Sequence, residues 1–203
     1  LGRLNEARDY LTRMLGVWEA RNQIAAISGC SLALAACDLE AGNHALAERS
    51  ATRSLDICRR GGNVLFELWV LPLLCDVYLQ TGRSQDTADC VERGFALLAS
   101  GEDWRGLPAP MHLARAMLAA TERRWHDAEH DFETALAINR RYTLPFDEAK
   151  TLAAWARMHL GRGSTGDREH ARERLGEALA IFERVDAARE VENTRVTLEP
   201  LRA

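Results

Sequence analysis

The sequence has almost no lysine and no surplus of basic charge, which argues against a role in binding nucleic acid. Among its 203 residues, 26 are basic and 30 are acidic, so the formal net charge is −4 at pH 7. Lys150 is the only lysine, and we attribute this bias toward arginine to a GC-rich genome rather than to recognition. Proteins that bind nucleic acid usually carry a basic patch or stripe. We therefore expect no direct contact with nucleic acid.

Membrane-spanning runs and secretion signals are also missing. No apolar stretch reaches the roughly 18 residues that a transmembrane helix needs. The N-terminus does not show the basic, apolar and small-residue regions of a signal peptide. We therefore expect a cytoplasmic protein with no membrane partner.

Paired cysteines of the kind found in zinc or redox sites are absent. The five cysteines are an odd number, and none belongs to a CxxC pair. They are Cys30, Cys37, Cys58, Cys75 and Cys90. Each lies in an apolar helical pattern, so we expect free thiols packed in the core of a protein from a reducing compartment.

What the sequence does contain is a repeat of about 40 residues. One pattern of small and large residues recurs with starts at Ala7, Ala47, Thr87, Ala128 and Ala171. Positions 4, 7 and 8 residues after each start lie on one face of a helix. A second recurring position lies upstream of the later copies and marks the helix that pairs with each of them. It is occupied by Leu34, Leu74, Ala114 and Trp155. Because nothing alternates with period two, the pattern predicts an all-α chain of helical hairpins without strands.

Turn signals divide the chain into these hairpins. Glycine-containing turns begin at Gly42, Gly82 and Gly161, whereas the third hairpin has Arg123-Arg124 at this place. We predict one helical-repeat domain over residues 1–203. It consists of a partial hairpin at 1–22, hairpins at about 23–62, 63–103, 104–143 and 144–186, and a terminal helix at about 187–199.

The N-terminus has the features of an internal cut. The chain begins with Leu1 rather than methionine, and the stretch Leu4–Trp18 has the pattern of the second helix of a hairpin. We therefore expect a fragment of a larger protein.

The repeated columns resemble the tetratricopeptide repeat. Leu74, Tyr78 and Gly82 match the first helix of that repeat. Its second helix is matched by Ala128, Phe132, Ala135 and Leu136. The resemblance implies an α-solenoid that winds as a right-handed superhelix, in which stacked hairpins share one core.

The period is nearer 40 than 34 residues, and the usual proline between repeats is mostly missing. This longer form is similar to the C-terminal repeat region of bacterial LuxR-like large ATP-binding regulators and of multidomain class III adenylate cyclases. Residues 152–182 carry this likeness best. It implies a scaffold or sensor segment beside catalytic or DNA-binding domains.

Two short motifs match catalytic or cofactor signatures in the wrong context. Residues 161–166 match GxGxxG but follow a predicted helix instead of a strand, so we interpret them as a turn. Thr165 and Asp167 have the character of helix N-caps, and Asp167 would cap the next helix. His126 and His130 match HxxEH, yet both face away from the packing column, toward solvent. We therefore predict no catalytic residue, no metal and no cofactor, and we do not expect an enzyme.

The first helices of such an array usually line a concave groove that contacts partners. Groove positions of tetratricopeptide repeats, carried over to this sequence, give five candidate contacts. They are Trp69, Asp76, His112, Lys150 and Arg157. An interpretation of the same residues as an ordinary solvated surface stays open.

The leading hypothesis is a protein-interaction or regulatory scaffold of a larger bacterial signalling or transcriptional regulator. Its groove would bind a peptide, a helix or a neighbouring domain, and its uncovered solenoid ends could support self-association. The alternative is a small-molecule effector sensor that controls an attached ATPase, cyclase or DNA-binding domain, which would need an enclosed pocket.

Overall fold

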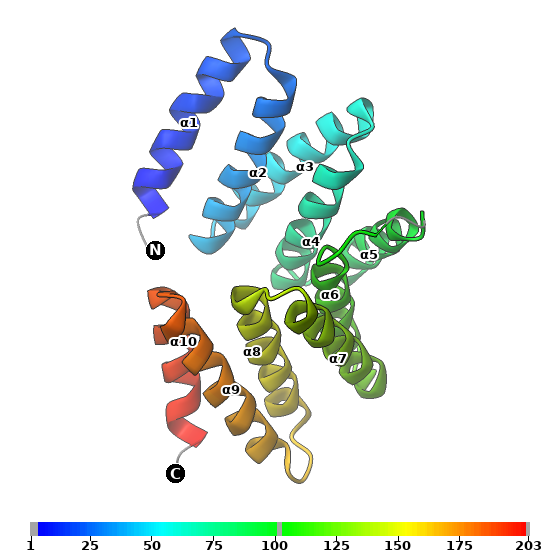
Figure 1. The fold of residues 1–203 in the computed structure, drawn as a ribbon, viewed down its shortest axis with the longest axis vertical. Helices are drawn as coiled ribbons and strands as arrows, with labels where there is room; N and C mark the ends of the chain where they lie inside the picture. Colours follow the sequence, from blue (N-terminus) through cyan, green and yellow to red (C-terminus); the bar gives the residue numbers. More distant parts are fainter. Residues whose placement is uncertain (1–3, 101–102, 202–203) are drawn as a thin grey trace. The chain divides into compact units, whose positions relative to one another are not determined.

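The protein is all-helical in a computed structural model that describes residues 4–100 and 103–201 (Figure 1). These residues form ten α-helices and one short 3-10 helix, with no strand among them. The predicted all-α class is therefore confirmed. No helix in this part of the chain is long and apolar enough to cross a membrane.

The helices belong to two compact units, which we call the N-terminal unit (residues 4–100) and the C-terminal unit (residues 103–201). The N-terminal unit holds α1 (Leu4–Ala20), α2 (Ile24–Glu40), α3 (His44–Gly61), α4 (Val64–Gln80) and α5 (Ser84–Leu98). The C-terminal unit holds α6 (Pro108–Thr121), α7 (Trp125–Arg141), α8 (Pro145–Arg162), α9 (Asp167–Arg184), α10 (Ala188–Leu198) and the 3-10 helix η1 (Glu199–Leu201).

Within each unit, every helix packs against the next one along the chain. The first helices of neighbouring hairpins also touch, since α2 contacts α4 and α6 contacts α8. Gly29 shows how close α2 and α4 come, because a Cβ atom at this glycine would lie 3.6 Å from the Phe66 ring. The prediction of one continuous repeat domain stays a prediction.

One type of turn ends seven of the helices in the described ranges. In the turn after α2, the N–H of Gly42 donates to the carbonyl of Leu39 (2.9 Å), and the N–H of Asn43 donates to that of Asp38 (2.8 Å). This is the Schellman pattern, which needs a left-handed residue at its centre. Glycine has this role at three of the turns, and Asn22, Arg123, Thr143 and Asp186 take it at the others. The Arg123-Arg124 turn, which has no glycine, thus has the same geometry as the glycine turns.

The second helices supply the predicted core columns. Ala47, Ala51, Ser54 and Leu55 are buried on α3, and Ala128, Phe132, Ala135 and Leu136 are buried on α7. The small residues let the first helix approach closely, and the large ones fill the remaining space. In the C-terminal unit, the Trp155 ring of α8 stacks on Phe132 with ring centroids 5.7 Å apart. The same column on α1 has no buried residue.

The left-handed conformation of Arg123 (φ 59°) gives a stability prediction. A non-glycine residue with positive φ is strained, and glycine removes most of that strain at a smaller entropic cost. We expect Arg123→Gly to stabilise the C-terminal unit by up to about 1 kcal/mol, measured as a higher urea midpoint. The neighbouring Arg124→Gly is the control, because Arg124 has φ −83° and gains nothing from glycine. Equal effects of the two substitutions would contradict the strain explanation.

Candidate functional site

Four buried carboxylates, each paired with arginine, connect helices within the two units. Their residues are only 2–4% exposed, and they are Asp38, Glu67, Asp131 and Asp167. Arg8 of α1 binds Asp38 of α2, while Arg59 of α3 and Arg93 of α5 both bind Glu67 of α4. A buried carboxylate without a partner would cost several kcal/mol. These pairs therefore restrict how the helices can pack, and they are not available to a ligand without being broken.

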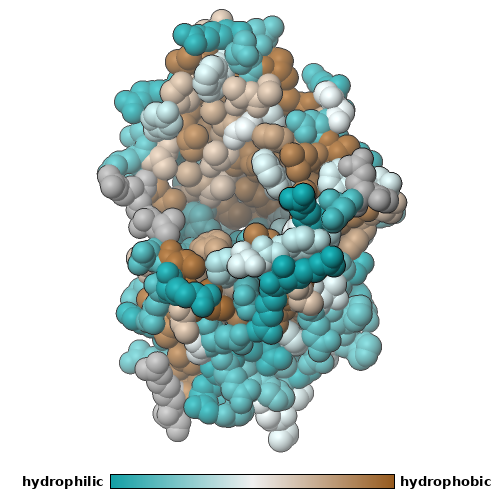
Figure 2. Space-filling model, viewed as in Figure 1, coloured by the Kyte–Doolittle hydropathy of each residue, from teal (hydrophilic) through white to brown (hydrophobic). Residues whose placement is uncertain are grey.

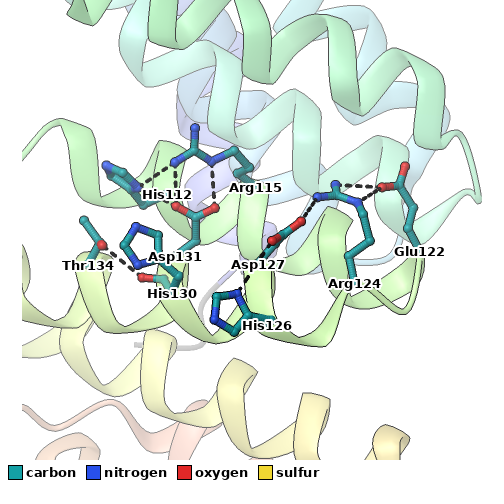
Figure 3. A network of polar contacts seen from close by, with 9 residues as sticks. All are labelled: His112, Arg115, Glu122, Arg124, His126, Asp127, His130, Asp131 and Thr134. Carbon is teal, nitrogen blue, oxygen red and sulfur yellow. Dashed lines mark hydrogen bonds and ion pairs between the residues drawn. The ribbon is translucent and has the colours of Figure 1, made fainter.

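Two hairpins of the C-terminal unit share a His-x-x-Arg arrangement that holds an aspartate. On α6, His112 Nδ1 lies 2.8 Å from Asp131 Oδ1, and Arg115 donates from Nε to Oδ2 and from Nη2 to Oδ1, both at 2.7 Å (Figure 3). Burial alone would raise the pKa of Asp131, but the hydrogen bonds from His112 and Arg115 lower it to about 2. The carboxylate is thus charged and fully engaged at neutral pH.

The second arrangement joins α8 to α9. His159 Nδ1 lies 3.0 Å from Asp167 Oδ1, and Arg162 binds both oxygens of that carboxylate, at 2.5 and 2.9 Å. The backbone N–H of Ser164 donates a further hydrogen bond to Asp167 (2.7 Å). These contacts hold the pKa of Asp167 far below its usual range, with the Arg162 hydrogen bond as the largest cause. Burial lowers the pKa of His159, so this imidazole is neutral at pH 7.

His159, Asp167 and His170 are the three side chains in the described ranges that come close enough together to hold a metal ion. Asp167, however, already accepts both hydrogen bonds of the Arg162 fork, and the positive charge of Arg162 opposes a cation there. The cluster is therefore better suited to joining α8 and α9 than to metal chemistry.

The helix start at this place differs from the sequence prediction. Gly166, with φ 85°, is the N-cap of α9, and Asp167 is the first helical residue. The prediction that Asp167 caps the helix is therefore wrong. Its carboxylate turns back toward α8 because Arg162 and His159 bind it there.

The HxxEH motif lies on the surface of α7, as predicted. The His126 side chain is 99% exposed, and His130 is exposed as well. In Figure 3 both rings lie outside the Asp131 network. The His126 ring lies 3.9 Å from Asp127, and the backbone carbonyl of His130 accepts a hydrogen bond from Thr134. The two histidines do not converge on a site with a third ligand among the described residues.

The structure places the five predicted groove residues on three helices in two units. Trp69 and Asp76 lie seven residues apart on α4, and Lys150 and Arg157 lie seven apart on α8, so each pair shares one helix face. Trp69, Lys150 and Arg157 are exposed, and Asp76 is half-buried. That all five residues form one groove stays a prediction.

His112, the fifth predicted contact, already has internal partners. Its Nδ1 is bound to Asp131, and Arg115 Nη2 lies 3.4 Å from the same nitrogen. The most direct structural role of His112 is therefore to connect α6 to α7.

An exposed apolar strip on α4 surrounds Trp69. Leu65 is 41% exposed and Trp69 is 45% exposed, one turn apart, and the Phe66 ring lies 5.0 Å from the Trp69 ring. Figure 2 shows apolar surface gathered over α2 and α4 in the upper half of the view. We call Leu65, Phe66 and Trp69 the α4 strip. Sequence reasoning found Trp69 and missed Leu65, although its i, i−4 spacing from Trp69 was a usable signal.

A cavity of about 410 Å³ lies between α1, α2 and α3, and sequence reasoning missed it entirely. Three arginines, two serines and three leucines contribute to its lining. The lining residues are Arg8, Thr12, Leu15, Ser31, Leu34, Asp38, Leu46, Arg49, Ser50 and Arg53. We call it the α1–α3 cavity. Because three separate helices contribute to its lining, no single sequence motif predicts this cavity.

A smaller, mainly apolar pocket of about 250 Å³ lies between α6, α7 and α8. Met117, Trp125, Phe132 and Met158 contribute to its wall, and the predicted groove residue Arg157 also lines it. Methionine side chains adapt to differently shaped apolar groups. Arg157 therefore lies beside an apolar depression instead of on a uniformly polar surface.

The fold is similar to that in the crystal structure of BtubC (BKLC) from P. vanneervenii. The TM-score is 0.60 with 14% sequence identity, over 98% of this chain and 88% of that chain. At this identity the similarity concerns the fold alone. No family model matches the sequence, and no curated protein matches it.

The low pKa of Asp131 predicts an acid-sensitive contribution to stability. The carboxylate stabilises the folded state above the unfolded pKa near 4, and this contribution is lost as pH falls toward about 2. It amounts to about 2 kcal/mol. We expect Asp131→Asn to lower the free energy of unfolding by this amount at pH 7, and the difference from wild type to shrink between pH 4 and pH 2.

Urea unfolding at a series of pH values measures this effect. Glu133→Gln is the matched control, because Glu133 is exposed on the same helix. A constant difference between Asp131→Asn and wild type over the whole pH range would show that the Asp131 charge is not responsible.

Proposed function

We propose that the chain is a tetratricopeptide-like α-solenoid that serves as a protein-interaction scaffold. Its hairpins repeat with a period of about 40 residues and stack as a right-handed superhelix. The contacts of α2 with α4 and of α6 with α8 support this proposal, because first helices are neighbours in stacked hairpins. The burial of small residues in the second-helix columns supports it too.

The observation that carries the proposal is the α4 strip. Soluble proteins seldom expose clustered large apolar residues without a partner that covers them. Tryptophan in particular is enriched among the residues that dominate binding energy at interfaces. A partner with large apolar side chains, presented on a helix or extended peptide, fits this face.

The polar clusters support a role without catalysis. Asp131 and Asp167 are buried, charged and bound by arginine forks, so neither is suited to accept a proton near pH 7. His159 is 2% exposed and does not reach solvent. On the resemblance of the longer repeat form to the repeat regions of bacterial regulators, we propose that the scaffold belongs to a signalling or transcriptional regulator. The partner is then a peptide, a helix or a neighbouring domain.

A second candidate function is small-molecule sensing, in which ligand binding controls an attached ATPase, cyclase or DNA-binding domain. The α1–α3 cavity favours it, because about 410 Å³ lies within the usual range of small-molecule sites. Several polar groups converge on leucine side chains there, as such sites require.

The scaffold proposal is tested by selecting displayed peptides against the immobilised chain and measuring the affinity of each selected peptide by fluorescence anisotropy. We expect peptides with large apolar side chains whose binding Trp69→Ala weakens about thirtyfold, the effect of losing an aromatic anchor worth about 2 kcal/mol. The unfolding midpoint of the variant is measured as well, because Trp69 is 45% exposed but also contacts the Phe66 ring, and the variant has to remain folded at the temperature of the binding assay.

Val196→Ala is the control, because Val196 is exposed on α10, outside the α4 strip. Peptides that bind both variants as tightly as wild type, or a selection without enrichment, would count against the α4 strip as a docking surface.

A further inference from the structure

Three helix faces converge on the α1–α3 cavity. Residues spaced by three, four or seven positions lie on one side of a helix, and the lining follows this spacing on every helix. On α1 the lining residues are Arg8, Thr12 and Leu15; on α2 they are Ser31, Leu34 and Asp38; on α3 they are Leu46, Arg49, Ser50 and Arg53. The cavity is thus built by regular helical faces and not by a loose loop.

Positive charge dominates the lining. Three guanidinium groups face one carboxylate, that of Asp38. Arg8 lies 2.8 Å from Asp38, which fixes its guanidinium, and Arg53 is held by exposed Glu19 at 2.6 Å. Arg49 is exposed and makes no ion pair or hydrogen bond with any residue that the structure describes. A bound anion would therefore meet the uncommitted guanidinium of Arg49 and that of Arg53, whose partner Glu19 is exposed, while Arg8 stays paired with Asp38.

Ser31 supplies an unsatisfied hydroxyl to the same cavity. The residue is 1% exposed, and its Oγ has no hydrogen-bond partner among the described residues. A buried hydroxyl without a partner destabilises a protein, and such groups call for a particular explanation. Because Ser31 lines the cavity, a ligand oxygen there could accept its hydrogen bond.

The remaining lining is apolar. Leu15, Leu34 and Leu46 come from the three different helices. They offer a surface for a short hydrocarbon group beside the charged residues, and small-molecule sites commonly combine such apolar walls with a few directed polar groups.

We propose that the α1–α3 cavity binds a small organic oxyanion, with a carboxylate or phosphate head group on Arg49, Arg53 and Ser31 and a short apolar body against the leucines. Guanidinium groups suit both head groups, because their paired N–H donors match the paired oxygens. The inference rests on the small-molecule alternative and names its ligand class. It does not depend on the α4 strip.

The test uses three six-carbon probes that differ in the head group: hexyl phosphate, hexanoate and hexan-1-ol. Binding of each probe to the whole chain is measured by isothermal titration calorimetry at low salt. We expect at least one of the two anions to bind with a stoichiometry of one, and hexan-1-ol to bind at least about tenfold more weakly, since it lacks the charge. Comparison of the two anions shows which head group the cavity prefers.

Two substitutions test the assigned residues. Arg49→Gln should weaken anion binding at least about tenfold, whereas Arg60→Gln should not, because Arg60 is exposed on the same helix but outside the cavity. Ser31→Ala should weaken binding severalfold and at the same time raise the unfolding midpoint of the ligand-free protein, because it removes the unsatisfied hydroxyl. A hydroxyl that is only a packing defect would raise the midpoint without changing affinity.

Three results would overturn the proposal: no binding of either anion, equal binding of hexan-1-ol, or equal weakening by Arg49→Gln and Arg60→Gln. The last result would indicate nonspecific attraction to surface arginines. Trp69→Ala should leave anion binding unchanged, and Arg49→Gln should leave peptide binding unchanged. The cavity and the α4 strip are thereby tested separately.

Discussion

The pairing of buried carboxylates with arginine is the interaction on which the packing within both units depends. Each pair crosses from one helix to another, and Glu67 of α4 collects arginines from both α3 and α5. A carboxylate removed from water is tolerated only when donors replace its hydration. A change in helix register that separated Arg162 from Asp167 would leave a charge buried without a partner. These pairs thus oppose alternative packings that the small, interchangeable core residues would otherwise allow.

The core itself is built mostly from alanine and leucine. These residues let helices approach closely, but they do little to fix the register between them. Ala47, Ala51, Ala128 and Ala135 are fully buried. Small residues of this kind permit several registers at similar cost, because few large side chains have to interlock. The stacked rings of Phe132 and Trp155 add shape in the C-terminal unit, and the Arg174 guanidinium lies 3.9 Å from the centroid of the Trp155 ring. The directional contacts are therefore electrostatic and aromatic, and the bulk of the core is permissive.

Some polar residues join helices to one another, and other surfaces remain exposed to possible partners. Histidines and carboxylates that resemble catalytic groups, such as His112 with Asp131, are used to join helices. The surfaces that we propose for partners are the α4 strip, for an apolar anchor of another protein, and the α1–α3 cavity, for a small anion. The proposed scaffold and sensor roles thus use different residues of the chain.

The sequence by itself determined the helices and the buried faces of α3 and α7, because these follow from local periodicity and from turns that close within five residues. The turn at Arg123 shows this, since its backbone hydrogen bonds match those at Gly42 without a glycine. Only the tertiary structure decided which polar residues are buried. From the sequence, Asp131 has the character of a surface residue and Asp167 that of an N-cap. An arginine of the neighbouring helix, however, holds each of them in a buried position. The α1–α3 cavity likewise depends on how three helices are rotated relative to one another. That rotation is set by tertiary packing, which the periodicity of the sequence does not predict.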